Sequence, residues 1–207
     1  MKNWVCFILL LLFVFSFGCP EEKKETNNNL VDLNSASVQH GPPEEFEYLD
    51  YTNYNVFEME KNIHSLINDE RTKLGLNTLE FDEHLALIAR KHSKDMADKN
   101  YFSHFDLPGN DFSYRYEQSN YDCKIVVGNL IHLGAENLFK YNIAKLVYTS
   151  GGVAEYNSQA ELEVAAVEGW MNSPGHRENI EKEFWLKEGI GVYIDEEGDV
   201  LVTENFC

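Results

Sequence analysis

The chain has 207 residues, of which 35 are acidic and 17 are Lys or Arg, so its formal net charge is −18. This acidic balance argues against a nucleic-acid partner and against docking on an anionic bilayer. Hydrophobic residues make up 43% of the sequence, which is the fraction of an ordinary globular protein and excludes disorder throughout the chain. The length predicts one domain with an appended tail.

The start of the chain has the features of an export signal. Lys2 precedes an apolar run over residues 4–17, which is shorter than the roughly 20 residues that span a bilayer comfortably. Gly18-Cys19 resembles the end of a lipobox, in which Cys19 becomes the lipidated first residue of the mature protein. Residues 1–19 are therefore predicted to be a signal peptide of the lipoprotein type. An ordinary cleaved signal and an uncleaved anchor are the alternatives, and each of the three predicts an extracytoplasmic protein, held at the cell membrane or secreted.

A polar linker is expected to follow the signal. Residues 20–54 are rich in Asn and Glu and are interrupted by a Gly-Pro-Pro sequence at residues 41–43. Too few apolar groups are present to offset the entropy of ordering, so this segment is predicted to be disordered. The folded domain is expected over residues 55–207.

Helical periodicity predicts the first two elements of this domain. Apolar side chains recur at helical spacing over residues 56–74, after the cap residue Asn55. A second helix begins after Asp82, another residue type that favours the N-cap position. His64 and His84 lie off the apolar faces of these two helices, and both are expected to be solvated.

The rest of the domain mixes helices with sheet segments. Helices come first, strands lie between and after them, and no alternation of strand and helix is visible, which favours α+β layers. Capping signals and alternating apolar residues mark the individual elements. The predicted elements are a helix at 112–117, strands at 125–133 and 138–139, a helix at 158–170, a helix capped by Ser173, and a hairpin of residues 190–194 and 200–206.

Four sequence strings indicate a known family. They are HSKDMA at 92–97, YFSH at 101–104, GAENL at 134–138 and GWMNSPGHRENI at 169–180. In this order they resemble the CAP superfamily, which comprises cysteine-rich secretory proteins, antigen five and pathogenesis-related proteins and is also described as the SCP domain. The likeness is strongest to the prokaryotic branch and covers about residues 56–206. It implies a three-layer α-β-α sandwich with a central antiparallel sheet.

The resemblance also implies a cleft lined by two histidines and two glutamates. Carried over by motif, the YFSH histidine is His104, the GAEN glutamate is Glu136, and the SPGHR histidine is His176. The second glutamate of the family falls on Ser173, which cannot act as a charged ligand and is more simply explained as a helix cap. The candidate site is therefore a triad.

Two imidazoles and a carboxylate can hold a divalent ion such as Zn²⁺ and leave a coordination position open. His104, Glu136 and His176 are thus candidate metal ligands and candidate catalytic residues, while a hydrogen-bonded cluster without metal is the alternative. The positive end of its helix dipole favours a neutral His176.

Two functions follow from this triad. The first is an exported binding module whose cleft takes a lipid, a peptide or a partner protein. The second is a hydrolase, either metal-dependent through Glu136 or serine-type through Ser103 or Ser173, although no HExxH motif is present. Whether the protein is an enzyme stays open, and the binding module is preferred.

Several polar residues near the motifs are expected to have structural roles. His92 shares a helix face with apolar residues, so a core histidine is the expected role. Asn137 and Asn179 are expected to hydrogen-bond with the backbone near the cleft. Trp170 is expected in the core.

The four cysteines are expected to differ in how they are processed and modified. Cys6 leaves with the signal and Cys19 is acylated, which leaves Cys123 and Cys207 as a candidate disulfide in an extracytoplasmic location. Two free thiols are the alternative. Joining the two cysteines would close a loop of about 84 residues, worth roughly 4–5 kcal/mol on the chain-entropy model.

Overall fold

The computed structural model describes residues 53–149 and 151–207. They belong to one compact unit of the chain, residues 45–207, which contains its own hydrophobic core and can therefore fold without the preceding segment. The predicted signal peptide, Cys19 and nearly all of the predicted linker lie outside the described residues. None of the described helices combines the length and the apolar character needed to cross a membrane.

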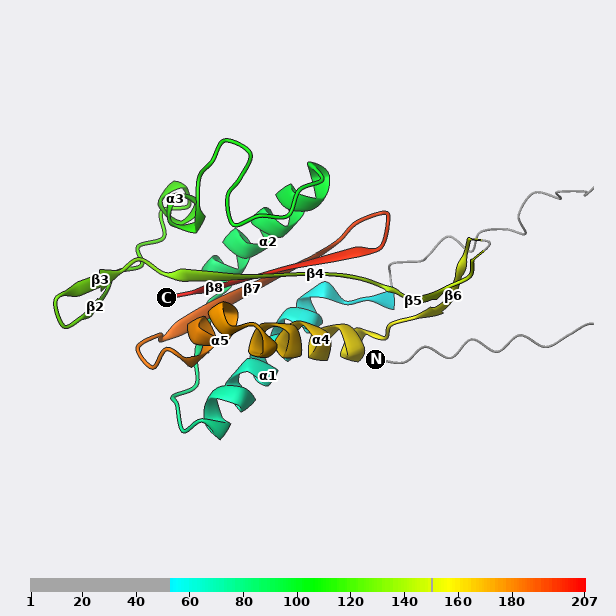
Figure 1. The fold of residues 1–207 in the computed structure, drawn as a ribbon. Helices are drawn as coiled ribbons and strands as arrows, with labels where there is room; N and C mark the ends of the chain where they lie inside the picture. The colour runs from blue at the N-terminus through cyan, green and yellow to red at the C-terminus, as the bar shows by residue number, and fades with distance from the viewer. Residues whose placement is uncertain (1–52, 150) are drawn as a thin grey trace, which may run out of the picture. The chain divides into compact units, whose positions relative to one another are not determined.

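A four-stranded sheet lies between two layers of helices (Figure 1). Helices α2 and α3 cover one face, and α1, α4 and α5 cover the other. This arrangement confirms the predicted α+β, three-layer architecture. In chain order the elements are α1 (Val56–Lys73), β1 (Glu80–Phe81), α2 (Glu83–Asp98), α3 (Phe112–Gln118), β2 (Ile125–Val127), β3 (Leu130–His132), β4 (Ala135–Asn142), β5 (Ala144–Val147), β6 (Val153–Tyr156), α4 (Gln159–Asn172), α5 (Pro174–Glu181), β7 (Lys187–Ile194) and β8 (Asp199–Phe206).

Side-chain caps begin three helices where the sequence predicts them. The side chain of Asn55 accepts a hydrogen bond from the backbone N–H of Glu58, and that of Asp82 accepts two at the start of α2. Ser158 and Glu161 form a reciprocal capping box at the start of α4. These caps satisfy backbone donors that a helix leaves without intrahelical partners.

The start of α5 differs from the sequence prediction in its capping hydrogen bond. Ser173 stands at the N-cap position, but its side chain makes no capping hydrogen bond. The extended backbone of Ser173 (φ −98°, ψ 115°) ends α4, and Pro174 then begins α5 with a favourable φ. Ser173 therefore separates two helices without capping the second.

The sheet segments differ from the sequence prediction in several places. The short β1 pairs with β7 in parallel, so the sheet is mixed, although β7, β8 and β4 are antiparallel as expected. The predicted strand at 125–133 is a hairpin of β2 and β3, because Gly128 turns the chain with φ +61°. β4 is longer than 138–139, since Glu136 and Asn137 near its start are buried but polar and hide the strand pattern. β5 and β6 are too short and irregular to predict.

Two glycines in β7 allow α2 to lie directly on the sheet. A Cβ added at Gly189 would lie 2.2 Å from the backbone N of Ala86, and one at Gly191 would lie 2.0 Å from that of Arg90. The hydroxyl of Ser93 also donates to the carbonyl of Gly191 at 2.8 Å. The loop that follows α2 and carries His104 therefore starts from a fixed position.

On the other face, buried tryptophans hold the last two helices. The Nε1–H group of Trp170 donates to the carbonyl of Leu138 in β4 at 3.0 Å, and that of Trp185 donates to Asn179 of α5 at 3.0 Å. Trp170 is 1% exposed, which confirms its predicted place in the core.

Candidate functional site

Glu136 lies at the centre of the candidate site. It is the second residue of β4, its side chain points to the face covered by α2 and α3, and that side chain is 0% exposed. One carboxylate oxygen, Oε1, is 3.0 Å from Nδ1 of His104, and the other, Oε2, accepts a hydrogen bond from Nη2 of Arg115 at 2.5 Å. Both oxygens of this buried carboxylate are therefore partnered, and the guanidinium balances its charge.

Arg115 is a site residue that the sequence motifs did not reveal. It lies on α3, where the Asp111 side chain caps the helix by accepting from two backbone N–H groups. Besides Glu136, the Arg115 guanidinium donates to the backbone carbonyl of His104 at 3.2 Å and 3.3 Å. Arg115 thus holds both the carboxylate and the loop that carries the histidine. No local pattern in the sequence marks this role.

His92 is buried beside the same carboxylate. Its Nε2 donates to the backbone carbonyl of Ser103 at 3.0 Å, and the same nitrogen is 4.0 Å from Oε1 of Glu136. Burial lowers the pKa of His92, which favours the neutral ring. The predicted core histidine is confirmed, and it fixes the backbone next to His104.

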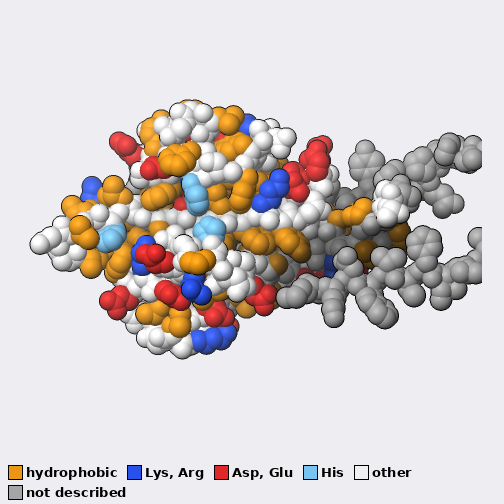
Figure 2. All heavy atoms as spheres, in the orientation of Figure 1, with side chains coloured by type: hydrophobic (Ala, Val, Ile, Leu, Met, Phe, Trp, Pro, Cys, Tyr) orange, Lys and Arg blue, Asp and Glu red, His pale blue; other side chains and the backbone are white. Residues whose placement is uncertain are grey.

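His176 faces His104 from the opposite helical layer. The two ring centroids are 6.2 Å apart. Burial and the neighbouring His104 lower the pKa of His176, so its ring is neutral near pH 7. His104 therefore contacts Glu136 and faces His176, and Figure 2 shows histidine side chains close together between the two helical layers.

Two asparagines fix the α5 side of the site. The amide of Asn137 donates to the backbone carbonyl of His176 at 3.1 Å. The amide of Asn179 donates to the backbone carbonyl of Glu136 at 3.4 Å and to the side-chain oxygen of Asn137 at 2.9 Å. Both predicted backbone contacts are confirmed, and they position α5 against β4.

A cleft of about 360 Å³ opens beside His104 and Glu136, and His176 is not among its lining residues. Phe105, which is 56% exposed, supplies apolar surface, and the amine of Lys182 donates to the side chain of Asn179 at 3.0 Å. Donor groups and aromatic surface therefore stand next to each other in this cleft. Its lining residues are His104, Phe105, Asp111, Phe112, Gly134, Ala135, Glu136, Asn179 and Lys182.

The three predicted metal ligands differ in whether they could coordinate an ion directly. Glu136 does not fit as a direct ligand, because both oxygens are occupied and one of them contacts a guanidinium. A carboxylate that accepts Nδ1–H of a histidine leaves Nε2 of that ring free to coordinate, which is a common outer-sphere arrangement. His104 and His176 fit as imidazole ligands. The described part of the chain places no three His, Cys, Asp or Glu side chains together as a ready metal site.

The two candidate nucleophiles are not activated by histidine. The hydroxyl of Ser103 accepts from the backbone N–H of Phe105 at 3.0 Å. Neither Ser103 nor Ser173 forms a hydrogen bond with an imidazole among the described residues. A serine nucleophile normally needs an adjacent base, so this arrangement does not support a serine hydrolase.

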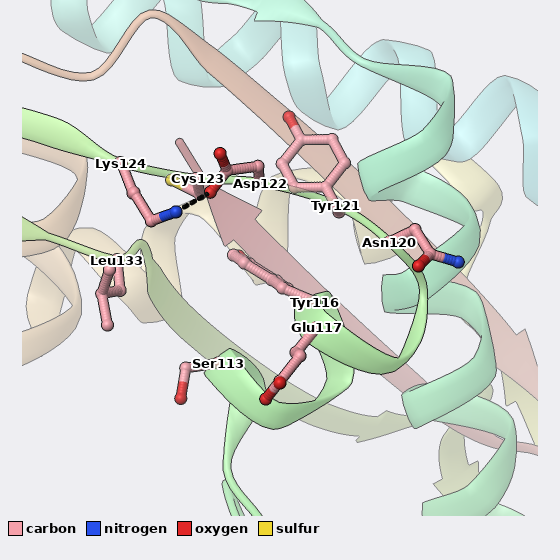
Figure 3. A pocket seen from close by; sticks show the side chains of 9 residues that line it. All are labelled: Ser113, Tyr116, Glu117, Asn120, Tyr121, Asp122, Cys123, Lys124 and Leu133. Carbon is pink, nitrogen blue, oxygen red and sulfur yellow. Dashed lines mark ion pairs between the residues drawn. The ribbon is translucent and has the colours of Figure 1, made fainter.

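A second cavity, of about 550 Å³, lies apart from the motif residues (Figure 3). Its walls come from α3, the segment that leads into β2, and Leu133 after β3. The hydroxyl of Tyr121 donates to Asp82 at 3.0 Å, and Lys124 pairs with Asp122 at 2.9 Å. Cys123 in this wall forms the predicted disulfide with Cys207, with a Cα–Cα distance of 5.6 Å.

A buried polar cluster on the α1 side of the sheet corrects the prediction for His64. Nδ1 of His64 lies 2.5 Å from Oε1 of Glu188, and the His64 side chain is 18% exposed, whereas His84 is exposed as predicted. Asn68 accepts from the backbone N–H of Leu79, so its amide group faces Nε2 of His64. The helical periodicity of the sequence does not reveal this contact, because the partner of His64 lies on β7.

The tautomer of His64 follows from these contacts. Since the amide of Asn68 donates to Nε2, the ring proton is on Nδ1 and is donated to Glu188. Glu204 lies next to Glu188, and both are completely buried. Oε2 of Glu188 and Oε1 of Glu204 have no hydrogen-bond donor among the described residues, which favours protonation of at least one of the two carboxyl groups. Burial accordingly raises the pKa of Glu188 to about 8 and raises that of Glu204 well above its ordinary value.

The raised pKa values of Glu188 and Glu204 predict that the free energy of unfolding depends on pH. The folded-state pKa values are raised above the ordinary value of 4.5, so the stabilisation is complete below about pH 4.5 and is lost as the pH rises toward about 8. Replacing Glu204 by Gln keeps an acceptor for the amide of Asn137, which donates to Glu204 at 2.8 Å, and removes one charge. We expect a flatter decline in the free energy of unfolding between pH 5 and pH 8.

Urea unfolding at several pH values measures this effect. Glu178→Gln is the matched control, because the side chain of Glu178 is 74% exposed and its replacement should leave the pH profile unchanged. An identical profile for Glu204→Gln and the wild type would show that the two buried carboxyl groups do not set the pH dependence.

Comparison with known proteins identifies the family. The model of the cysteine-rich secretory protein family, or CAP, matches residues 64–206. The uncharacterized protein YkwD of Bacillus subtilis is 32% identical over 169 residues, which cover 82% of this chain and 56% of YkwD. The uncharacterized membrane protein YlbC of the same strain is 35% identical over 133 residues, which cover 64% of this chain and 31% of YlbC. The matched segments thus span just under a third of YlbC and just over half of YkwD.

Solved structures share the fold. An extracellular protein containing a SCP domain from Bacillus anthracis is 29% identical with a TM-score of 0.53, and the match covers 72% of this chain and 40% of that chain. An outer surface protein from Borrelia burgdorferi is 21% identical with a TM-score of 0.55, and the match covers 74% of this chain and 94% of that chain. Since the family model spans most of the described domain, this chain belongs to the cysteine-rich secretory protein (CAP) family.

Proposed function

We propose that this protein is an exported binding module, in which His104 and His176 contact the ligand and Glu136 and Arg115 hold His104 in place. The observation that carries the proposal is the full partnering of Glu136. Its two oxygens are engaged by His104 and Arg115, so the buried carboxylate orients other groups and is not free to act as a base.

A polypeptide segment is the ligand that suits the cleft best. Its carbonyl groups would accept hydrogen bonds from the amine of Lys182, which lines the cleft. Its apolar side chains would cover Phe105, which is 56% exposed. The export signal predicted at the start of the chain supports a role outside the cytoplasm, as does the likeness to a bacterial protein described as extracellular.

A divalent ion such as Zn²⁺ would be held by His104 and His176, with Glu136 as the outer carboxylate. When bound, the ion would supply a positive charge for ligand carbonyl or carboxylate oxygens. The neutral state of His176 favours this, because only an unprotonated imidazole nitrogen can coordinate.

Equilibrium dialysis against Zn²⁺ tests the histidine pair. We expect residues 45–207 to retain one zinc ion near pH 7.5, and His104→Ala or His176→Ala to weaken retention at least about tenfold, since each removes one of two imidazole ligands. His84→Ala is the matched control, because His84 is exposed and packs against Tyr121 outside the cleft. No zinc in the wild type, or equal loss in the His84 variant, would refute the assignment.

The same proteins separate a binding module from the hydrolase. Incubated with an unbiased peptide library, the wild type is expected to retain peptides without cutting them, and the His104 and His176 variants to retain fewer. Cleavage by the wild type that disappears in both variants would establish the hydrolase in place of the binding module.

A further inference from the structure

The β2–β3 hairpin exposes an unusual amount of apolar surface. It extends from one end of the molecule (Figure 1), and Figure 2 shows a group of apolar side chains just behind the tip at that end. Single exposed apolar residues are normal, but a contiguous group of them marks an interaction site. The exposed fractions are 68% for Val126, 66% for Leu130 and 64% for Ile131.

Both faces of this hairpin are apolar. Val126 pairs with Ile131, and Val127 pairs with Leu130, so the two pairs lie on opposite faces because side chains alternate along a strand. The sequence has no charged residue from 125 to 135. Within the described sheets, β2 and β3 pair only with each other. The face with Val126 and Ile131 is therefore open, whereas on the other face the Ile125–His132 pair at the base packs against the domain and only Val127 and Leu130, nearer the tip, stay exposed.

The β5–β6 hairpin provides an internal comparison. It also exposes apolar side chains, with Leu146 at 55% and Val147 at 56%. In contrast to β2–β3, it contains Lys145, which forms ion pairs with Glu155 at 3.0 Å and Glu161 at 2.7 Å. Charged side chains within the element keep this second hairpin compatible with water.

We propose that the tip of the β2–β3 hairpin inserts into the interfacial region of an electrically neutral lipid bilayer. A protein partner that packs on one face of a two-stranded ribbon leaves the other face in water, whereas lipid surrounds both faces. The hairpin carries no charge of its own, and the net charge of −18 on the chain disfavours an anionic membrane.

The expected depth of insertion is limited by the backbone. The outer edges of both strands carry unpaired N–H and C=O groups, which are costly in the hydrocarbon core. Strands of three residues reach only about 10 Å, which matches the depth of the headgroup and acyl boundary. The tip residues, Gly128 and Asn129, would therefore stay near the polar boundary.

The predicted membrane anchor places the domain within reach of a bilayer. A linker over residues 20–54 spans at most about 120 Å when fully extended. Anchored at Cys19, the domain would be held at a high local concentration near the lipid surface, so even weak insertion would keep it there. At the other end of the hairpin, His132 stacks on Phe184 with ring centroids 4.4 Å apart, which fixes its base to the domain.

Vesicle sedimentation tests the proposal with residues 45–207, which lack the signal and the lipidation site. The probe is a phosphatidylcholine vesicle. We expect the wild type to sediment with vesicles and the double variant Val126→Ser/Ile131→Ser to show a partition coefficient lower by roughly 10- to 100-fold, because it loses two large aliphatic side chains. Leu146→Ser/Val147→Ser is the matched control and should partition like the wild type.

Each other outcome contradicts membrane insertion. A wild-type protein that stays in solution, or an equal loss in the control, refutes it directly. Sedimentation equilibrium without lipid is run in parallel. A dimer of the wild type that is lost in Val126→Ser/Ile131→Ser would assign the hairpin to a second copy of the chain. All substituted residues are more than half exposed, so the variants are expected to fold, and their urea midpoints check this.

Discussion

Replacing Cys123 and Cys207 together by Ala is expected to lower the free energy of unfolding by about 2–5 kcal/mol. The bond closes a loop with a sequence separation of 84, so its loss releases a large entropy of the unfolded chain. In the folded state Cys207 stays attached, because its carbonyl accepts from the N–H groups of Leu186 and Lys187 at 2.8 Å and 2.7 Å. The destabilisation should therefore arise chiefly in the unfolded state.

Urea unfolding with and without a reductant measures this effect. The double variant should also show a larger dependence of the free energy on denaturant, because an unfolded chain without the crosslink exposes more surface. Wild type in reductant is the control and should match the double variant. An unchanged midpoint in both would show that the disulfide contributes nothing to stability.

Replacing Arg71 by Met is expected to cost about 3–5 kcal/mol, because it leaves buried polar groups without partners. The Arg71 side chain is completely buried and donates to three backbone carbonyls, those of Asn77 at 2.9 Å, Ile180 at 2.5 Å and Lys182 at 3.0 Å. It thereby joins the end of α1 to the end of α5. Its charge also attracts the buried carboxyl pair of β7 and β8.

Urea unfolding near pH 7 also checks this expectation. Arg177→Met is the matched control, because Arg177 is 47% exposed and its contact with Glu181 is a long surface ion pair of 3.7 Å, which should cost less than about 1 kcal/mol. Equal effects of the two substitutions would show that the buried contacts of Arg71 do not stabilise the fold.

Local patterns predicted the parts of this fold that depend on neighbours in sequence. The caps at Asn55, Asp82 and Ser158 act within one helical turn, so their residue types are sufficient to place three helix starts. The full length of β4 was not predicted from the sequence. Glu136 and Asn137 near its start are buried polar residues whose hydrogen-bond partners come from other elements.

The candidate site was likewise predictable only where a sequence motif marks its residues. Motif resemblance located His104, Glu136 and His176, whereas the position of Arg115 depends on how α3 packs against the sheet. His64 was expected in solvent because its partner, Glu188, lies 124 residues away. Interactions of this kind depend on tertiary packing and leave no periodic signal. The signal peptide, the lipidation of Cys19 and the disorder of the linker stay predictions.

The tautomer of His104 tests the binding module most directly. Nitrogen NMR of ¹⁵N-labelled histidines, assigned with His104→Ala and His176→Ala, reports which ring nitrogen carries the proton. If Glu136 orients His104, the neutral ring is protonated at Nδ1, and added Zn²⁺ shifts the Nε2 signals of both His104 and His176. A proton on Nε2 of His104, or Nε2 signals that do not respond to Zn²⁺, would contradict the proposed site.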